Sequence, residues 1–460
     1  MKHSGLADSA RPFAEYTEVR SQENRSSQIS LLNGDAVSNG SGTQSGVSAR
    51  VHKNGVWGFA SSPEKDRAAL RSCVERATAN ALFLASKEGR DAGLLPSRPG
   101  TGDHDLASGS PGRSKSELVE FMRDLDAHCA KSLPGLASRS LGLSRLDMEK
   151  TLATSDGADS WSLIPRTLIF VSLTLAARGE PIELYDVFGG LGSFEDVFSE
   201  PSALYGRIDL LAERLRQKAR GVYAKPGTHD VILDADLAGI LAHEAIGHTV
   251  EADLVLGGSV AADYLGQPVA SPLISLTDFA HDALGRRCPV PVWVDDEGIE
   301  ARDAVIIDRG VLSSYMHNKE SAAHFGAEPT GNARAYGFSD EPIIRMRNTA
   351  ILPGQSSLED MIAGVDRGYY FLRPSNGQAD STSEFMFGVT MGYEIRGGKL
   401  GPAVRDCTVS GVAFDVLKTV SAVSQDMSWT AAGMCGKKQS IPVGMGGPAI
   451  RCRMNVGGRA

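Results

Sequence analysis

The sequence predicts an α+β protein with two domains, an N-terminal α/β domain of hairpins and helices (residues 1–225) and a β-rich, barrel-like C-terminal domain (residues 226–460). Its length of 460 residues predicts more than one core, because single hydrophobic cores rarely grow beyond roughly 250–300 residues. In the first half, hairpin signals are followed by helical periodicity. In the second half, one helix is followed by strand patterns and many glycines. These observations favour two successive domains of different architecture.

The chain from Tyr16 to Ser61 has the pattern of consecutive β-hairpins. Apolar and polar residues alternate between Asn-Gly turn signals at 33–34 and 54–55, which predicts strands in TEVRSQEN, SSQISLLNG, GVSARVHKNG and VWGFASS. A helix is expected next. The residues from Ser62 to Glu64 favour a helix start, and DRAALRSCVERATANALFLA has apolar residues at helical spacing.

The remainder of the N-terminal half alternates between loop, helix and strand patterns. The segment from Ser97 to Lys115 is rich in Gly, Ser and Pro, which indicates a loop rather than a packed element. A helix is predicted from Ser116 to Cys129, and weaker strand and helix patterns continue to Gly221. We expect the domain boundary at residues 223–228.

The C-terminal half is rich in strand patterns and in glycine. Turns that end hairpins are predicted at 308–310 (Asp-Arg-Gly) and at 396–398 (Arg-Gly-Gly). Repeated hairpins of this kind are typical of an antiparallel barrel or sandwich. We therefore expect a barrel-like C-terminal domain.

Composition excludes some classes of function. The net charge of −9 and the pI near 5.6 provide no basic surface for phosphate backbones, so we expect no nucleic-acid partner. The N-terminus has no apolar signal region and no window approaches the ~18 apolar residues of a membrane span, so we expect a cytoplasmic protein that does not enter membranes. The six cysteines form no CxxC pair, which indicates free thiols in a reducing compartment.

The stretch LAHEAIGHTVEAD, residues 241–253, carries the strongest chemical signal. It places His243, Glu244 and His248 on a predicted helix that begins near Leu237, after an aspartate cap at Asp234 or Asp236. On an ideal α-helix the two histidines lie about 140° apart, with Glu244 at an angle between them. A π-bulge or local unwinding at Gly247 would bring the imidazoles closer to one ion.

Two histidines do not complete a catalytic zinc site, which usually has three protein ligands and an open position. Cys435 is a candidate third ligand, because it lies in a glycine-rich loop, and Lys437 and Lys438 would favour its thiolate. Glu251 could hydrogen-bond a ligating imidazole and fix its tautomer. The pattern taken alone is also compatible with packing histidines and a buried, inert cysteine.

Several ordered segments resemble the TldD/PmbA family of modulator-of-gyrase metallopeptidases, and specifically its TldD-type catalytic subunit. The quoted matches are GVSARVHKNGVWGFASS, LAHEAIGHTVEAD, VDDEGIEARDAVIIDRGVLSSYMHNKESA, PTGNARAYGF, RMRNTAILPG, GYEIRGGKLGPAV and GMCGKKQSIPVGMGGP. The resemblance implies Zn²⁺ held by His243, His248 and Cys435, with Glu244 as the base that activates a metal-bound water. It also implies a dimer, either with a PmbA/TldE-type paralogue or with a second copy, and a chamber that admits unfolded peptides.

On this resemblance we expect a zinc-dependent metallopeptidase that hydrolyses amide bonds in unfolded peptides or in peptide-like intermediates of natural-product biosynthesis. The peptide would lie along an exposed strand edge, where backbone hydrogen bonding does not depend on side chains. Polar residues expected near the substrate are Thr330, Asn332, Arg334 and Arg345.

Two other functions remain open from the sequence. One is a non-hydrolytic subunit of a TldD/PmbA-type dimer that binds a peptide or a partner. The other is a metal-dependent enzyme of another type, such as a deacylase or a redox enzyme, because ligation by two histidines and a cysteine suits zinc without excluding iron or copper.

Overall fold

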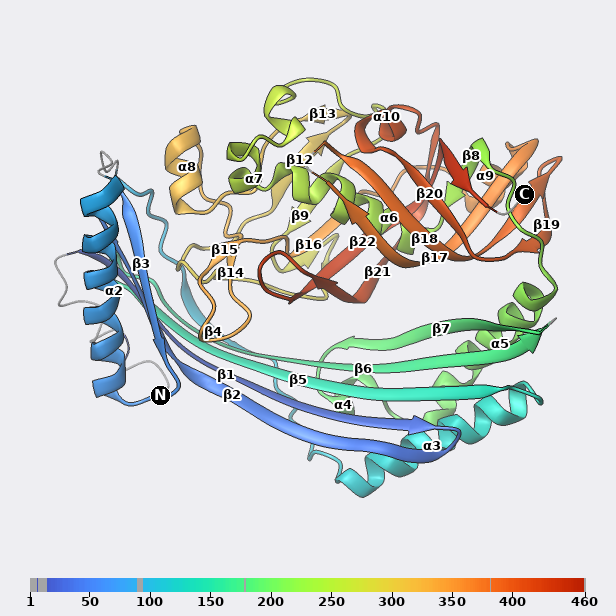
Figure 1. Ribbon diagram of the computed structural model, residues 1–460, viewed down its shortest axis with the longest axis horizontal. Helices are drawn as coiled ribbons and strands as arrows, with labels where there is room; N and C mark the ends of the chain where they lie inside the picture. The colour runs from blue at the N-terminus through green and yellow to red at the C-terminus, as the bar shows by residue number, and fades with distance from the viewer. Residues whose placement is uncertain (1–5, 7–14, 89–93, 178, 381, 459–460) are drawn as a thin grey trace.

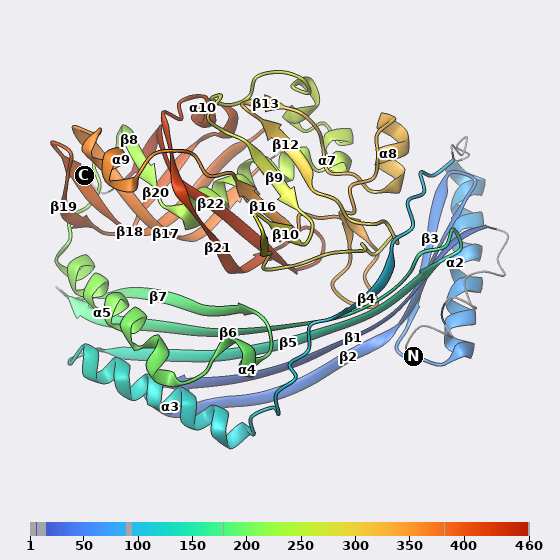
Figure 2. The same cartoon turned by 180° about the vertical axis from the view of Figure 1, so that it is seen from behind.

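The computed structural model describes residue 6 and residues 15–88, 94–177, 179–380 and 382–458. The outermost residues of both predicted domains therefore lie outside the described part of the chain. Within the described part, each half of the chain has one large β-sheet. The N-terminal sheet is long and curved, and the C-terminal half lies against its concave side (Figures 1 and 2).

The N-terminal sheet has the strand order β3-β2-β1-β5-β6-β4, with β7 also paired to β6. Apart from the parallel pair β4–β6, its strands pair antiparallel. The strands are β1 (Tyr16–Leu32), β2 (Asp35–Lys53), β3 (Val56–Ser62), β4 (Thr101–Asp105), β5 (Ser138–Thr154), β6 (Asp159–Ala177) and β7 (Glu180–Leu191).

Alternation along these strands separates two faces, as a period of two requires. In β1, odd-numbered residues such as Val19 and Leu31 are buried in clusters with helical residues. Even-numbered residues such as Arg20 and Gln22 donate hydrogen bonds to the backbone carbonyls of Gly337 and Tyr336 in the C-terminal half. The outer face is therefore apolar and covered by helices, and the inner face is polar where it meets the C-terminal half. The helices of this half are α2 (Arg67–Glu88), α3 (Lys115–Ser132), α4 (Phe194–Val197), η1 (Pro201–Leu204) and α5 (Tyr205–Arg220).

Most expectations for the N-terminal elements are confirmed. Both Asn-Gly turns exist, with Asn33 and Asn54 at positive φ, and α2 and α3 cover the two predicted helices. The segments TEVRSQEN and SSQISLL, however, lie in the single strand β1. The loop expected at residues 97–115 was wrong in one part, because residues 101–105 form β4, which pairs parallel with the start of β6. Its glycine and polar side chains gave no strand signal, because the pairing uses backbone groups.

The C-terminal sheet contains a closed five-stranded barrel. Its ring runs β8-β17-β18-β20-β22 and returns from β22 to β8. The barrel-like expectation is thus confirmed, and the predicted turns at 308–310 and 396–398 join β12 to β13 and β18 to β19. The barrel strands are β8 (Gly227–Leu233), β17 (Arg367–Ala379), β18 (Glu384–Arg396), β20 (Cys407–Val412) and β22 (Ile441–Gly457).

Further strands extend the sheet or form small hairpins beside the barrel. β21 pairs with β22 at one side, and β16 pairs parallel with β22 and leads to β9, β12 and β13. These strands are β9 (Leu276–Phe279), β10 (Asp282–Ala283), β11 (Arg286–Arg287), β12 (Ala304–Asp308), β13 (Val311–Leu312), β14 (Ala333–Arg334), β15 (Ile343–Ile344), β16 (Asn348–Ile351), β19 (Lys399–Val404) and β21 (Ala422–Cys435).

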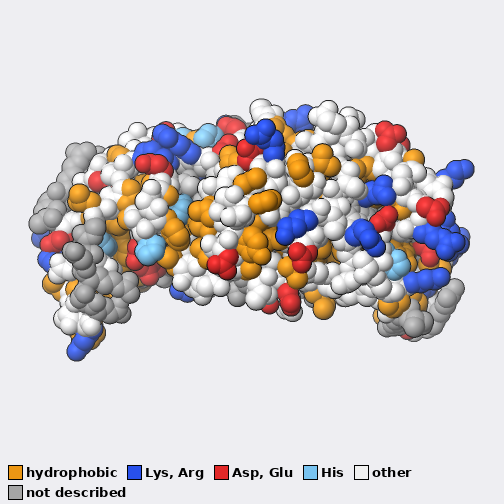
Figure 3. Space-filling model, turned by 90° about the horizontal axis from the view of Figure 1, so that it is seen from above, with side chains coloured by type: hydrophobic (Ala, Val, Ile, Leu, Met, Phe, Trp, Pro, Cys, Tyr) orange, Lys and Arg blue, Asp and Glu red, His pale blue; other side chains and the backbone are white. Residues whose placement is uncertain are grey.

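The largest hydrophobic core lies in the C-terminal half, where the helix after β8 packs against the barrel strands. The helices of this half are α6 (Ala235–Ile240), η2 (Leu241–Gly247), η3 (His248–Val250), α7 (Ala252–Leu256), η4 (Val260–Asp263), α8 (Lys319–Phe325), α9 (Leu358–Ala363) and α10 (Ala413–Lys418). Among the residues that the structure describes, no helix is long and apolar enough to cross a membrane. The face in Figure 3 intersperses basic and acidic side chains around a central group of hydrophobic ones.

Candidate metal centre

The two histidines lie on one irregular helix that begins directly after barrel strand β8. Asp234 caps the helix, since its Oδ1 accepts a hydrogen bond from the backbone N–H of Leu237 at 2.9 Å. After α6 the helix widens into the π-helix η2, and the backbone N–H of His248 donates to the carbonyl oxygen of His243. The predicted π-bulge is thus present, and it extends through the whole of residues 241–247.

Two glycines let this helix approach its neighbours. A Cβ on Gly247 would overlap the sulfur of the fully buried Met346, so this position has no room for a side chain. A Cβ on Gly239 would lie 3.0 Å from the backbone nitrogen of Gly446 in β22, which is tighter than an ordinary contact. Close packing against Met346, just before β16, and against β22 therefore fixes where the helix presents its histidines.

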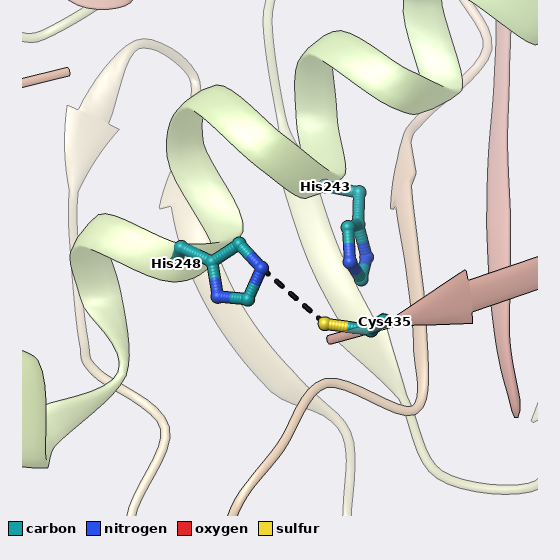
Figure 4. A group of neighbouring side chains, drawn as sticks. All are labelled: His243, His248 and Cys435. Carbon is teal, nitrogen blue, oxygen red and sulfur yellow. Dashed lines mark hydrogen bonds between the residues drawn. The ribbon is translucent and has the colours of Figure 1, made fainter. Parts of the chain in front are cut away.

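The side chains of His243, His248 and Cys435 converge on one point (Figure 4). Their candidate ligand atoms all lie within 4.8 Å of one another, and the Cys435 sulfur is 3.3 Å from Nε2 of His248. Zinc bond lengths of about 2.0–2.3 Å at tetrahedral angles place neighbouring ligand atoms roughly 3.3–3.6 Å apart. The three side chains thus need only a small adjustment to share one ion.

The burial of these residues fits a metal site. His243 is fully buried, and neither of its ring nitrogens has a hydrogen-bond partner among the described residues. Burying an imidazole without a hydrogen-bond partner is unfavourable for the stability of the fold, unless another group binds the ring nitrogens. A metal ion is such a group, and the set of two nitrogens and one sulfur matches known zinc chemistry.

The electrostatics of the cluster favour a metal-binding thiolate. Burial acts to raise the pKa of the Cys435 thiol, but the neighbouring imidazoles of His243 and His248 lower it to about 4. Burial acts to lower the pKa of His248, but the Cys435 sulfur and Glu251 raise it to about 10. Without an ion the site therefore pairs a thiolate with an imidazolium, and the thiolate is the form that ligates metals.

Glu251 lies behind His248, as the sequence suggested. Its Oε2 is 3.1 Å from Nδ1 of His248, and the carboxylate is fully buried. Burial acts to raise the pKa of Glu251, but His248 and Lys437 lower it, so the group is ionised. Lys437 was expected to favour the Cys435 thiolate, but the partners of its ammonium group are Glu251, Asp253 and the carbonyl oxygen of Ile344. The Nζ of Lys437 lies 3.1 Å from Oε2 of Glu251.

Glu244 lies beside the ligand cluster and is partly exposed. Its Oε2 is 3.6 Å from Nε2 of His248, and a quarter of its side chain is accessible to solvent. It is not among the three residues whose ligand atoms converge. Because it is partly exposed, this carboxylate can contact both the cluster and a small molecule that enters from solvent.

The four polar residues expected near the substrate form an internal network in this structure. Thr330 donates from Oγ1 to Asn332 Oδ1 at 2.7 Å, and Asn332 is fully buried and donates to Asp278. Arg334 donates to two backbone carbonyls, and Arg345 to three. Their contact with a substrate stays a prediction.

Family models match three consecutive parts of the chain. The PmbA/TldA metallopeptidase C-terminal domain matches residues 226–458, domain 1 matches residues 17–81 and the central domain matches residues 110–221. The chain belongs to the PmbA/TldD metallopeptidase family. This confirms the resemblance that the sequence motifs indicated, and the C-terminal match contains the whole His-His-Cys cluster.

Curated relatives of this chain are named as metalloproteases. A metalloprotease of Methanothermobacter thermautotrophicus is 32% identical over 454 residues, covering 95% of this chain and 94% of the relative. A zinc metalloprotease TldD homolog of Saccharolobus solfataricus is 31% identical over 290 residues, covering 62% of this chain and 64% of the relative.

Solved structures share the fold. A Thermotoga maritima protein, solved as a candidate modulator of a DNA gyrase, superimposes with a TM-score of 0.77 at 20% identity and 96% coverage of both chains. TldE from Thermococcus kodakarensis gives a TM-score of 0.75 at 18% identity, again with 96% of both chains covered. At these sequence identities the likeness shows a shared fold and nothing further.

The sequence alone missed how the residues around the cluster connect. Lys437 was expected to favour the thiolate of Cys435, and Arg345 was expected to lie near the substrate. Their partners lie far away along the chain: 90 positions separate Arg345 from Cys435, and 186 separate Lys437 from Glu251. No local pattern in one sequence can indicate such pairs.

Proposed function

We propose that this chain is the zinc-binding catalytic subunit of a peptidase that hydrolyses amide bonds in unfolded peptides or in peptide-like biosynthetic intermediates. The observation that carries the proposal is the convergence of His243, His248 and Cys435 beside the partly exposed carboxylate of Glu244. Membership of a metallopeptidase family and relatives named metalloprotease support it.

Each residue of the cluster has a distinct task in this reaction. His243, His248 and Cys435 would hold the zinc ion. When bound, the ion polarises the scissile carbonyl and makes a water molecule more acidic. Glu244 accepts the proton of the attacking water at a carboxylate oxygen and returns it to the nitrogen of the leaving amine. Glu251 keeps Nδ1 of His248 occupied, so Nε2, which lies 3.3 Å from the Cys435 sulfur, is the nitrogen that would bind the ion.

An open strand edge leads to the cluster and could hold the peptide. β21 ends at Cys435, and β22 is its strand partner among the described residues. At its other edge, the backbone contacts with residues 354–356 lie near residues 423–425. We infer that an extended substrate pairs with the remainder of this edge, from Asp426 towards Cys435. Pairing through backbone groups suits unfolded peptides, because it is indifferent to side chains.

The partner in solution would be a PmbA/TldE-type paralogue or a second copy of the chain. The fold shared with TldE supports either arrangement, because both partners would then have the same architecture. A pathway role in natural-product biosynthesis stays within the proposal as one source of peptide-like substrates.

The proposal is tested with Glu244→Gln. We expect the purified wild-type chain, with its partner where one is required, to contain about one zinc ion and to cleave an unfolded peptide. Glu244→Gln should keep the zinc and lose at least about 100-fold in kcat, the usual contribution of a general base. The exposed Glu320→Gln is the matched control and should keep full activity. Full activity of Glu244→Gln would refute the assigned base.

Metal analysis separates the alternatives. A metal-free wild-type chain that still assembles with its partner would support the non-hydrolytic subunit. Stoichiometric iron or copper in place of zinc, with activity that a chelator abolishes, would support a metal-dependent enzyme of another type.

A further inference from the structure

We propose that Arg345 and Lys437 are positioning residues that set the geometry of the metal centre through one turn, residues 435–439. Arg345 fixes the turn from which Cys435 projects. Lys437, within that turn, fixes His248 by holding Glu251. The inference rests on the proposed metal site and adds the contacts that hold two ligands from distant elements, His248 and Cys435, in a fixed relative position.

Arg345 holds the turn by three backbone carbonyls. Its Nη1 donates to the carbonyl oxygens of Lys437 at 2.8 Å and Gln439 at 2.7 Å, and its Nη2 donates to that of Cys435 at 2.5 Å. Lys438 has a φ of 56°, so the turn includes a left-handed residue other than glycine. A planar guanidinium presents several donors in fixed directions, which a lysine cannot do.

The guanidinium serves the turn rather than a counter-ion. Arg345 is fully buried, and within the described part of the chain no carboxylate lies within ion-pair distance of it. Its Nε has no hydrogen-bond partner there. Burying a charge with an unsatisfied donor is unfavourable for stability. Such a residue is better explained by the geometry that its other donors impose on the turn.

The backbone of Arg345 is itself held from behind. Its N–H donates to the carbonyl oxygen of Asn332 at 2.8 Å, and its carbonyl oxygen accepts from Nδ2 of Asn332 at 3.0 Å. Asn332 is fully buried and also donates to Asp278. Asn332, itself bonded to Asp278, therefore fixes the backbone of Arg345.

Lys437 connects the turn to the helix ligand. Its Nζ lies 3.1 Å from Oε2 of Glu251 and 2.7 Å from Oδ2 of Asp253, and it donates to the carbonyl oxygen of Ile344 at 3.1 Å. The same Oε2 of Glu251 is 3.1 Å from Nδ1 of His248. One side chain, two residues after Cys435, thus holds the group that orients the imidazole.

These contacts join ligands that the chain brings from far apart. His248 comes from the helix and Cys435 from the end of β21, and 187 positions separate them. With the Arg345 and Lys437 contacts in place, a displacement of the turn moves Cys435 and the support of His248 together. Loss of groups that orient metal ligands typically lowers metal affinity by roughly 10- to 100-fold.

The test uses cobalt(II) as a probe of the purified full-length protein, because cobalt occupies zinc sites and its visible spectrum reports thiolate ligation and geometry. We expect wild type to give a thiolate charge-transfer band. Arg345→Lys and Lys437→Met should bind zinc roughly 10- to 100-fold more weakly in competition with a chelating dye. Their cobalt d–d bands should also shift. Lys437→Arg, which keeps the ion pair with Glu251, should have the zinc affinity and the cobalt spectrum of the wild type.

Matched controls are buried cations far from the turn. Arg405 is 3% exposed and donates to the carbonyl oxygen of Ala219, and Lys218 is 1% exposed and donates to Glu183 and Asp406. Arg405→Lys and Lys218→Met should leave both the affinity and the spectrum unchanged.

The outcomes separate this inference from the proposed function. A wild-type protein without a thiolate band would overturn the proposed metal site itself. A wild type with the band, together with folded variants of unchanged zinc affinity and cobalt spectrum, would overturn the positioning role alone. If Arg345→Lys does not fold, Lys437→Met and its rescue by Lys437→Arg still decide whether the turn orients His248.

Discussion

The backbone N–H of His248 donates a hydrogen bond to the carbonyl oxygen of His243, five residues earlier, and the two ring centroids are 5.3 Å apart. In an α-helix a five-residue spacing would separate the two side chains by about 140°. The π-helix turns them towards a common point, where the Cys435 sulfur also lies. A spacing that looks irregular for a zinc helix is therefore the spacing that this backbone requires.

The first prediction concerns Gly247, the last residue of the π-helix. Glycine-to-alanine changes inside helices normally stabilise by up to about 1 kcal/mol. Here we expect Gly247→Ala to lower the free energy of unfolding by about 1–3 kcal/mol, because the added Cβ overlaps the sulfur of Met346 and overpacks a filled core. Urea unfolding followed by circular dichroism measures the change.

Two variants control the Gly247 experiment. Gly206→Ala lies in the first turn of α5 with open space around its Cβ, and it should be neutral or slightly stabilising. Met346→Ala and Gly247→Ala together should cost less than the sum of the two single changes, because Met346→Ala vacates the overlapping volume. A stabilised Gly247→Ala would contradict the close packing described for this helix.

The second prediction concerns removal of the metal. An ion that binds only the folded state stabilises it by about 4 kcal/mol when its free concentration is 1,000 times Kd. We expect the Tm to rise with added zinc and to fall with a chelator. Cys435→Ser should abolish this response, whereas Cys407→Ser, at another buried cysteine, should retain it. A response equal in both variants would place the ion elsewhere.

Local signals predicted much of the fold, because some elements are determined by nearby residues. The hairpin at Asn33 needs only a left-handed turn between alternating strands. The helix α3 has a complete capping box, with Ser114 and Glu117 bonded reciprocally. Strand β4 was missed because it has no apolar alternation and is defined by its pairing with β6. Closure of the barrel from β22 to β8 likewise depends on residues more than 200 positions apart.

The residues of the candidate site likewise divide into those that the sequence could predict and those that it could not. His243, Glu244 and His248 could be predicted because they share one helix, and Gly247 marked the deformation. Cys435 could be proposed from its glycine-rich surroundings and from the family resemblance, but the expectation that it lies in a loop was wrong, because it ends strand β21 and pairs with Ile441. The roles of Arg345 and Lys437 could not, because each depends on a distant partner whose position only the tertiary structure supplies.

The third prediction concerns a buried ion pair in the C-terminal half, between Arg347 and Asp278. Arg347 and Asp278 are both fully buried, with Nε 2.9 Å from Oδ2. Removing one member of such a pair leaves an uncompensated charge, which typically lowers the free energy of unfolding by roughly 3–5 kcal/mol. We expect Arg347→Met to lose about this much free energy of unfolding. The exposed pair Arg309–Asp308 is the control, and Arg309→Met should change stability by less than about 0.5 kcal/mol.

Arg347→Met combined with Asp278→Asn distinguishes charge from packing. If the uncompensated carboxylate causes the loss, the double variant should be more stable than Arg347→Met alone. An equal or greater loss in the double variant would instead assign the effect to the hydrogen bonds that Arg347 donates to backbone carbonyls.

The fourth prediction is a pH dependence of stability that originates at His317. Burial lowers the pKa of His317 from its ordinary value of 6.5 to about 4, so the folded protein holds the ring neutral. Between these two pH values the unfolded chain binds more protons at this position than the folded protein. The associated stability is therefore complete above pH 6.5 and is lost as the pH falls to about 4, by a total of about 3 kcal/mol.

Urea unfolding between pH 4.5 and 7.5, with a chelator present throughout, measures this contribution. We expect His317→Gln to lose less stability than wild type as the pH falls, because its side chain does not titrate. Ser321→Ala removes the hydroxyl 3.1 Å from Nδ1 of His317 and a capping residue of α8, but it keeps the imidazole. It should lower the whole curve by about 1 kcal/mol without changing its slope. Parallel curves for wild type and His317→Gln would show that the acid sensitivity comes from other groups.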